Sequence, residues 1–220
     1  MAGARGNQRT YRSPLREEAA RRTRETVVAA AAEVFCAEGY TGATIEQITA
    51  RAGVSRPTVF GVGTKAQLFA LARQRAATGG RLAANDEHFR QLMAIPDAHR
   101  LLTEFAAFTA GISQRLGPLQ LALEQAAGTE PELAQLLESS QQELVECARG
   151  IVTAAAATGS LRSDITQETA TDVLWLQIQP ANYRRLVHER GWSHRAFEDW
   201  HAATMINALL GPRTTAGKPA

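Results

Sequence analysis

Residues Thr44–Phe60 read TIEQITARAGVSRPTVF, and this stretch decides the fold of the N-terminal part of the chain. It begins with a capping-box pattern, because Thr44 is followed three residues later by Gln47. The pattern predicts a helix that starts at this threonine. The helix is expected to end near Ala52, because a glycine follows there.

The second half of the stretch predicts a tight turn and another short helix. Gly53 supplies a residue that tolerates left-handed backbone. Ser55 is a favourable cap for the next helix, whose first turn accepts Pro57 because that position needs no helical amide donor. Two short helices that cross at such a turn indicate a helix-turn-helix, which presents the start of its second helix to the major groove of DNA.

A further helix is expected on each side of this unit. Upstream, apolar residues recur at helical spacing from Val27 to Phe35 and predict a helix that starts at about Glu17 or Thr23 and that Gly39 ends. Downstream, Thr64 opens another helix through a second capping box, and this helix is expected to stop near Gly79.

Charge is distributed unevenly along the 220 residues. The first 75 residues hold 12 Lys and Arg against 6 Asp and Glu, whereas the remainder holds 12 against 16. A basic head on a mildly acidic body favours a face that binds a polyanion, although a solvated arginine-rich tail would produce the same asymmetry. We expect the first 16 residues to form a disordered arm that reaches the minor groove or phosphates through Arg5, Arg9, Arg12 and Arg16.

A set of residues between positions 26 and 65 matches a known pattern: Thr26–Ala31, Phe35, Gly39, Tyr40, Ala43, Thr44, Ile48, Ala52–Ser55, Thr58–Phe60 and Lys65. With these residues the sequence resembles the tetracycline-repressor (TetR) family. The resemblance implies an all-helical homodimer with a three-helix DNA-binding head and a divergent ligand-binding body.

The exposed candidates for reading DNA lie at the start of the third helix: Ser55, Arg56, Pro57 and Thr58. Arg56 can bond two acceptors of a guanine at once through its planar guanidinium. Thr44 and Lys65 lie in the first turns of helices, where backbone amides and the helix dipole favour a phosphate. The resemblance assigns DNA contacts to five of these positions: Thr44, Ser55, Arg56, Thr58 and Lys65.

Two departures from the family pattern concern the exit from the third helix. Phe60 stands where the family usually has tyrosine, so it lacks the hydroxyl that bonds a phosphate, a loss of about 1 kcal/mol. The link from Thr58 to Lys65 is one residue shorter than the pattern, and Gly61 and Gly63 are expected to loosen the helix end. A head that kept its packing but no longer binds DNA is the alternative interpretation.

Beyond the head the chain is predicted to be helical almost throughout, because alanine is abundant and no stretch alternates with period two. Helices are expected over 83–95, 97–116, 119–127, 131–158, 166–190 with an interruption at Pro180, and 193–210. The predicted fold class is all-α, with an N-terminal helix-turn-helix domain and a larger helical C-terminal domain. The expected division is a basic arm (1–16), a DNA-binding domain (17–75), an effector-binding and dimerisation domain (76–211) and a disordered tail (212–220).

The body carries no pattern that indicates catalysis. It has no phosphate-binding glycine loop, no nucleophile motif and no Cys/His cluster with metal spacing, so we expect neither an enzyme nor a bound metal or cofactor. Cys36 and Cys147 are expected to be core thiols; a redox sensor is the alternative.

Large apolar side chains on the body helices indicate a cavity for an apolar or amphipathic small molecule. By the resemblance, its wall is expected to include Phe89, Met93, Phe105, Phe108, Gln120, Leu121, Trp175 and Gln179. Ordinary core packing is the alternative for each of these residues.

The last two long helices resemble the dimerisation pair of the family. The expected interface residues are Tyr183, Leu186, Val187, Phe197, Trp200, Thr204 and Ala208. Two such pairs would form a four-helix bundle with two-fold symmetry, and two heads could then bind the half-sites of a palindromic operator on double-stranded DNA. Burial of Phe197 and Trp200 within the monomer is the alternative.

The sequence therefore predicts a dimeric, ligand-responsive DNA-binding regulator, a repressor released from its operator by a small effector. The alternatives are a constitutive regulator with a filled body and, from another class, a helical enzyme with a basic head. Neither a signal peptide nor a long apolar run is apparent, so we expect a cytoplasmic protein without membrane contact.

Overall fold

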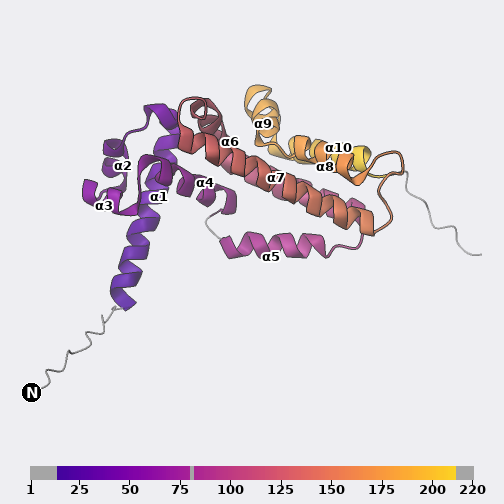
Figure 1. Ribbon diagram of the computed structural model, residues 1–220, viewed down its shortest axis with the longest axis horizontal. Coiled ribbons are helices and arrows are strands. Elements are labelled where there is room, and N and C mark those ends of the chain that lie inside the picture. Colours follow the sequence, from indigo (N-terminus) through magenta and orange to yellow (C-terminus); the bar gives the residue numbers. More distant parts are fainter. Residues whose placement is uncertain (1–13, 80–81, 212–220) are drawn as a thin grey trace, which may run out of the picture.

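The computed structural model describes residues 14–79 and 82–211, and these are helical nearly throughout (Figure 1). The elements in chain order are α1 (Pro14–Gly42), α2 (Ile45–Ala52), α3 (Arg56–Val62), α4 (Lys65–Thr78), α5 (Leu82–Met93), α6 (Ala98–Ala126), α7 (Pro131–Ala157), α8 (Gln167–Gln177), α9 (Pro180–Tyr183), the π-helical segment η1 (Arg184–Glu189) and α10 (His194–Leu209). The described residues form no strand beyond an isolated antiparallel bridge between Leu161 and Leu210. The predicted all-α class is confirmed.

The first helix is longer than its apolar pattern suggested. It begins at Pro14, a residue suited to the first turn because it has no amide to leave unbonded. Arg16, expected in a disordered arm, therefore belongs to α1, whereas Arg5, Arg9 and Arg12 lie outside the described residues. The regular helix breaks at Gly39, where φ is 68° and ψ is −179°, at the residue predicted to end it.

Two capping boxes fix the starts of α2 and α4, as the sequence predicted. Thr44 Oγ1 accepts from the Gln47 amide at 3.2 Å, and the Thr44 amide donates to Gln47 Oε1 at 2.7 Å. Thr64 and Gln67 repeat this arrangement at 3.3 and 2.9 Å. Gly53 ends α2 in the left-handed region with φ of 66°, so the predicted turn is also confirmed.

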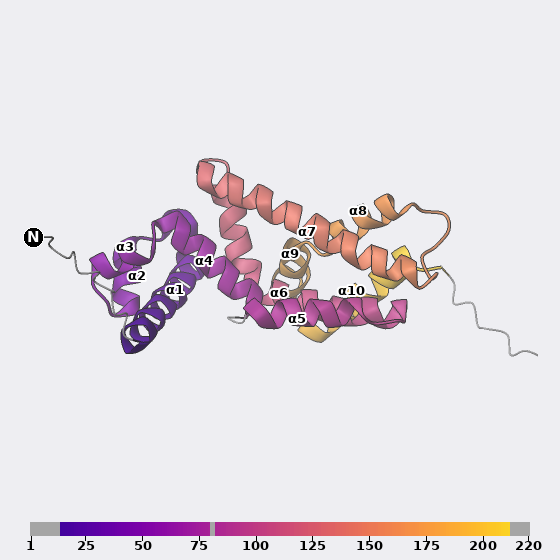
Figure 2. The same ribbon diagram turned by 60° about the horizontal axis from the view of Figure 1, so that its bottom comes forward.

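The sequence prediction was wrong for α6. One helix spans Ala98–Ala126 with Pro118 inside it, where two helices were expected. Proline removes one helical hydrogen bond and crowds the preceding turn, which bends a helix but need not end it. Figure 2 shows the two halves of α6 running in different directions. Leu116 and Leu119 are both buried in the same cluster, so packing stabilises the helix on both sides of the proline.

The head and part of the body share one hydrophobic core. Phe69 of α4 packs edge-to-face against Phe35 and Tyr40 of α1, with ring centres 4.9 and 5.3 Å apart. The same cluster includes the second half of α6 and Leu133 of α7. This core therefore crosses the boundary that was expected near residue 75.

A second core fills the body between α6, α7, α8 and α10. It includes Leu101, Phe105, Ile151, Leu174 and Met205, all of which are fully buried. α7 and α8 lie side by side on one side of the body, and α10 packs along α6 (Figures 1 and 2). The head, α1–α4, lies at one end of this elongated arrangement.

The segment expected to be one interrupted helix over 166–190 is divided into three. α8 ends at Gln177, α9 starts at Pro180 as the predicted interruption required, and six residues from Arg184 follow as a π-helix. The final helix lies where it was predicted, after the Ser193 cap. Within 14–79 and 82–211, no helix combines the length and apolar character needed to cross a membrane.

Candidate DNA-binding surface and ligand cavity

The first turn of α3 exposes the residues expected to read DNA. Ser55 caps the helix by accepting a hydrogen bond from the Thr58 amide, and the two hydroxyl oxygens lie 2.8 Å apart. Ser55, Arg56 and Pro57 are exposed, and Thr58 is half-buried. The two hydroxyl groups are therefore ordered by local contacts, while the arginine side chain stays accessible.

Arg56 has two neighbours on the surface of the head. Its Nη1 lies 2.8 Å from Glu46 Oε1 of α2, and its guanidinium carbon lies 5.4 Å from the ring centre of Phe60. Both side chains of the ion pair are more than 60% exposed, so the pair contributes at most about 1 kcal/mol. A guanine or phosphate can therefore replace Glu46 as the partner of Arg56. The half-exposed Phe60 ring has no hydroxyl to donate to a phosphate, but it orients the guanidinium of Arg56.

Two further helix starts supply possible phosphate contacts. Thr44 is exposed and uses its oxygen as an acceptor within its capping box, so its hydroxyl proton remains available to a phosphate. Lys65 Nζ lies 4.5 Å from the centre of the Tyr40 ring. Burial lowers the pKa of Lys65, an effect that Glu130 opposes. These contacts hold the first turn of α4 against the end of α1.

The short link between α3 and α4 is a close-packed turn. α3 continues through Gly61 and Val62, and it ends where the Gly63 amide donates to the Val59 carbonyl at 3.3 Å. A Cβ atom on Gly63 would lie 2.9 Å from both Cβ and Oε1 of Gln67, the residue that completes the capping box of α4. Glycine is therefore required at 63 by close approach, whereas Gly61 has open space around it.

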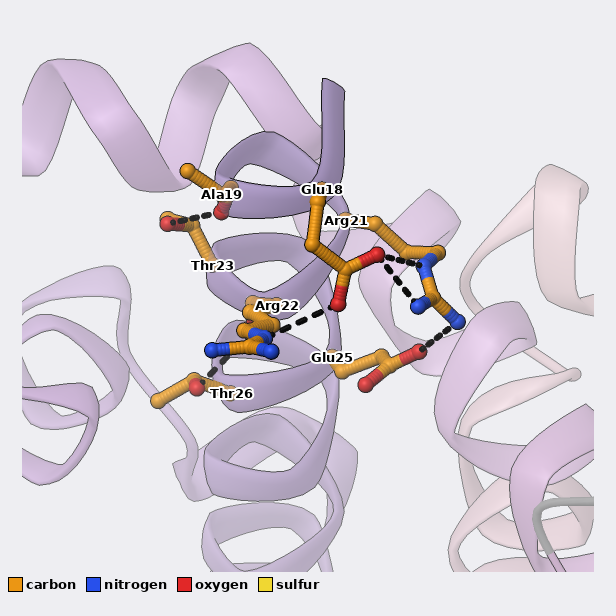
Figure 3. Close-up of polar contacts among 7 residues, drawn as sticks. All are labelled: Glu18, Ala19, Arg21, Arg22, Thr23, Glu25 and Thr26. Atoms are coloured by element: carbon orange, nitrogen blue, oxygen red, sulfur yellow. Dashed lines mark hydrogen bonds and ion pairs between the residues drawn. The ribbon is translucent and has the colours of Figure 1, made fainter. Parts of the chain in front are cut away.

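The first turns of α1 carry exposed ion pairs (Figure 3). Glu18 accepts from Arg21 and, at 2.9 Å, from Nε of Arg22, and Arg21 also lies 3.7 Å from Glu25. The pairs are solvent-exposed along one helix, so each adds little to stability. The arginines remain available to a polyanion, as does the exposed Arg16.

A cavity of about 720 Å³ lies where α4, α6 and α7 meet. Its size is within the range of about 300–1,000 Å³ that is usual for small-molecule sites. The apolar part of its wall includes Phe108, Ile112, Leu116, Leu136, Leu144 and Ile178. The polar part includes Arg73, Gln74, Thr78, Thr109, Ser113, Gln120, Ser139, Ser140, Gln141 and Glu143.

Two of the eight expected wall residues, Phe108 and Gln120, line this cavity. Trp175 and Gln179 lie behind it, since Trp175 Nε1 and Gln179 Nε2 each donate to Gln141 Oε1 at 3.1 Å. Of the helices that carry the expected residues, only α6 contributes to the cavity wall, and the sequence did not reveal the contributions of α4 and α7. Four expected residues are not part of this lining: Phe89, Met93, Phe105 and Leu121.

Arg73 is the cavity residue that the sequence did not reveal. It lies on α4 with 6% of its surface exposed, its Nη2 is 3.4 Å from Ser140 Oγ of α7, and its Nη1 has no hydrogen-bond partner. Burial lowers the pKa of Arg73 to about 10, and Glu124 and Glu143 oppose this only in part. In the sequence it is one arginine among several, and only long-range packing shows that it is buried.

His201 is a second buried titratable group. It is 2% exposed, stacks on Phe197 with ring centres 5.0 Å apart, and places Nε2 3.2 Å from Thr109 Oγ1. Its Nδ1 has no partner. Burial lowers the pKa of His201 to about 4, so the ring is neutral at pH 7. The cavity wall and α10 are thus joined through Thr109.

The residues expected at a dimer interface divide into two groups. Tyr183 and Phe197 are 1% and 2% exposed and pack edge-to-face within the chain, which corrects their assignment to an exposed interface. For Phe197 the structure supports the alternative of burial within the monomer. The other five are only half-buried in the single chain: Leu186, Val187, Trp200, Thr204 and Ala208.

Both cysteines are free thiols. Cys147 is half-buried in the cavity wall, and burial raises its pKa to about 11, which disfavours the reactive thiolate. Cys36 is exposed, so the expectation that it lies in the core is wrong. In the part of the chain that the structure describes, no three His, Cys, Asp or Glu residues are grouped so that they could hold a metal ion.

Three capped helices with an exposed α3 define the head as a helix-turn-helix DNA-binding domain. Residues 27–71 match the family described as bacterial regulatory proteins, tetR family. The matched stretch contains the residues of the head that are expected to contact DNA, from Thr44 to Lys65, but not the arginines of the N-terminal arm. Over these residues the head is therefore similar to the DNA-binding domain of that family. No curated protein sequence matches it significantly.

Solved structures share the fold over nearly the whole chain. A transcriptional regulator from Saccharomonospora viridis in complex with choline has 16% identity and a TM-score of 0.71, covering 87% of this chain and 100% of that one. NalD, the secondary repressor of the MexAB-OprM multidrug efflux pump in Pseudomonas aeruginosa, has 21% identity and a TM-score of 0.67, covering 88% and 98%. FadR from Bacillus subtilis in complex with stearoyl-CoA has 17% identity and a TM-score of 0.67, covering 84% and 98%.

Proposed function

We propose that this protein is a dimeric repressor that a small amphipathic effector releases from a palindromic operator. The observation that carries the proposal is the position of α4. Its first turn, with Lys65, lies against the end of α1 in the head, and its later turns line the cavity through Arg73, Gln74 and Thr78. One rigid helix therefore joins the DNA-binding surface to the ligand cavity.

On the DNA side, α3 enters the major groove and Arg56 reads a guanine after releasing Glu46. Thr44 and Lys65 bind backbone phosphates on either side. The exposure of Arg56 and the free hydroxyl proton of Thr44 support these roles. Ser55, Pro57, Thr58 and Phe60 complete the contact surface.

The C-terminal end of α4 is bonded to the body, so a movement in the body can change the tilt of α4. Arg115 of α6 donates from Nε to the Ala76 carbonyl at 2.9 Å and so binds the last turn of α4, where the helix dipole is negative. An effector that moves α4 relative to α6 would tilt the head. A ligand that binds one tilt better shifts the population toward it and away from the spacing that fits two major grooves.

Dimerisation would use the outer faces of α8 and α10. Leu176 on α8 is 62% exposed and Trp192, just before α10, is 36% exposed, and both are large apolar side chains. Together with the half-buried Trp200 they offer a surface that a second copy could cover. Such pairing would place two heads one helical turn of DNA apart.

DNA binding is tested with a fluorescent library that includes the DNA upstream of the protein's own coding region. Selection of a palindrome, followed by anisotropy measurements, is the expected result. Arg56→Ala should weaken binding by about tenfold or more, because a bidentate base contact contributes about 1–3 kcal/mol of discrimination. Arg90→Ala is the matched control, since Arg90 is an equally exposed arginine paired with a glutamate on α5. Binding that shows no sequence preference would refute the operator.

The dimer is tested by sedimentation velocity at low micromolar concentration. A species of twice 23.7 kDa is expected, and Leu176→Glu should shift it toward the monomer. A wild-type protein that sediments as a monomer would contradict the proposal. The cavity favours an effector-responsive protein over the constitutive alternative, in which the body would be filled.

A further inference from the structure

The wall of the cavity combines an apolar surface with one buried cation. Phe108, Ile112 and Leu144 supply aliphatic and aromatic contact area, and Arg73 lies among them with 94% of its surface shielded from solvent. A buried charge is costly unless it is paired and hydrogen-bonded. Arg73 meets this condition only in part, since a single 3.4 Å contact to Ser140 leaves Nη1 without a partner.

Two carboxylates lie near this guanidinium without binding it. Glu143 of α7 lines the same cavity and Glu124 lies on α6, and both act on Arg73 through space. Both act on Arg73 as nearby charges only, and Nη1 of Arg73 has no hydrogen-bond partner. Desolvation therefore outweighs the attraction of these two groups, and the cation is incompletely compensated.

We propose that the effector is an organic monoanion, a carboxylate attached to an apolar skeleton, and that Arg73 is its anchor. The planar guanidinium can donate to both oxygens of a carboxylate at once. Ser140, beside it, already donates its hydroxyl proton to the Leu136 carbonyl at 2.7 Å, so Arg73 holds the carboxylate while the skeleton lies over Phe108, Ile112 and Leu144. This inference rests on the effector-binding role proposed above and specifies its chemistry.

The charge in the cavity selects a monoanion over other ligands. A neutral molecule would leave the guanidinium uncompensated, and a cation would be repelled by it. A dianion such as a phosphate monoester would bring a second negative charge toward Glu143. A monoanion compensates Arg73 and adds no further charge.

The anchor also explains how binding could reach the head. Arg73 lies on α4 and donates to Ser140 on α7, so a carboxylate bound to Arg73 would act where these two helices meet. Because α4 runs from the cavity to Lys65, a movement of α4 at the cavity would also move the DNA-binding surface.

Calorimetric titration of the full-length protein with three probes that share a ten-carbon chain tests the proposal: decanoate, decan-1-ol and decyltrimethylammonium. Wild-type protein should bind decanoate about tenfold or more tightly than the alcohol, because a hydrogen bond to a charged group is stronger than one to a neutral group. The ammonium compound should bind no better than the alcohol. If decanoate has no advantage over the alcohol, the proposal is overturned.

The variant Arg73→Met, which retains length and apolar contact, should lose the preference for decanoate and bind it within about twofold of the alcohol. Arg75→Met is the matched control, because Arg75 is an exposed arginine on the same helix that does not line the cavity. It should retain the wild-type preference. An unchanged preference in Arg73→Met would also overturn the proposal.

Thermal unfolding without a ligand separates an anchor from a structural arginine. If Arg73 is an uncompensated charge in the ligand-free protein, Arg73→Met should melt at or above the wild-type temperature, because the substitution removes that buried charge. A marked fall in its melting temperature, with the decanoate preference intact, would assign Arg73 a structural role instead. Arg73→Lys should retain part of the preference, since it keeps the charge but not the fork.

DNA binding is measured separately, so the two proposals can fail independently. Selective decanoate binding that Arg73→Met abolishes, in a protein that selects no operator, would refute the repressor and retain the anion site. Operator binding that decan-1-ol and decanoate release equally would retain the ligand-responsive repressor and refute the anion site.

Discussion

The head and the cavity region use polar side chains in opposite ways. In the head, the polar contacts that shape the helices join residues three positions apart, as between Thr44 and Gln47. Around the cavity, the two buried titratable side chains bond residues far away in the sequence, Arg73 to Ser140 and His201 to Thr109. Local contacts leave a pattern in the sequence and long-range contacts do not, so the same kinds of side chain are predictable in one region and hidden in the other.

The two regions nevertheless share one core, and this makes the comparison testable. Phe69→Ala should lower the free energy of unfolding by about 3–5 kcal/mol, because Phe69 is fully buried between Phe35 and Tyr40. All three tryptophans lie in the body, so their fluorescence reports on that region while circular dichroism reports on the whole chain. The two signals should change together in guanidinium chloride.

Phe60→Ala is the control for this experiment. Phe60 belongs to the same head but is half exposed, so the change should cost less than about 1 kcal/mol. Separate transitions for the two signals would show that head and body unfold independently, and the shared core would then not couple them.

The buried histidine of the body makes stability depend on pH. The pKa of His201 is about 4 in the folded protein and near 6.5 when unfolded, so the unfolded state binds more protons between these values. Stability should therefore fall as the pH is lowered from 6.5 toward 4, by about 2 kcal/mol between pH 7.5 and pH 5.

This histidine contribution is measured by urea denaturation at both pH values. His201→Gln should lose about 2 kcal/mol less than the wild type on acidification, whereas His99→Gln should behave like the wild type. Equal losses in all three proteins would contradict the assignment of the pH effect to His201.

The two glycines of the α3–α4 link should respond in opposite directions. Gly61→Ala should stabilise the protein by about 0.5–1 kcal/mol, because Gly61 is helical with open space around it. Gly63→Ala should destabilise it by about 1–2 kcal/mol, because the added Cβ would press on Gln67 at 2.9 Å. Thermal melts of the pair check this, and a stabilised Gly63→Ala would show that the link is looser than its geometry indicates.

The last prediction concerns the ion pair between Arg56 and Glu46 and its effect on operator affinity. Glu46→Gln should strengthen operator binding about threefold to tenfold, because it frees Arg56 and removes a negative charge near the phosphates. Glu87→Gln on α5 removes a similar pairing far from the head and should have no effect. Anisotropy at two salt concentrations gives both affinities; a weaker Glu46→Gln complex would mean that Glu46 orders Arg56 for DNA.

Two of the predictions that failed share a physical cause. Separate helices were expected over 97–116 and 119–127, but burial of Leu116 and Leu119 in one core stabilises a single helix on both sides of Pro118. Tyr183 and Phe197 were expected on an outer face, yet they pack on each other beneath it. In each case a local rule was overridden by contacts between elements distant in sequence.

The sequence by itself determined the three-helix head, because its caps and turn glycines act within a few residues. It also determined the all-α class and the position of α10, through apolar periodicity. Only the tertiary structure decided that the head shares its core with α6 and that Arg73 is a buried cation in a cavity wall. Burial and compensation of charge depend on which helices pack together, and that arrangement follows from the summed contacts of the whole chain.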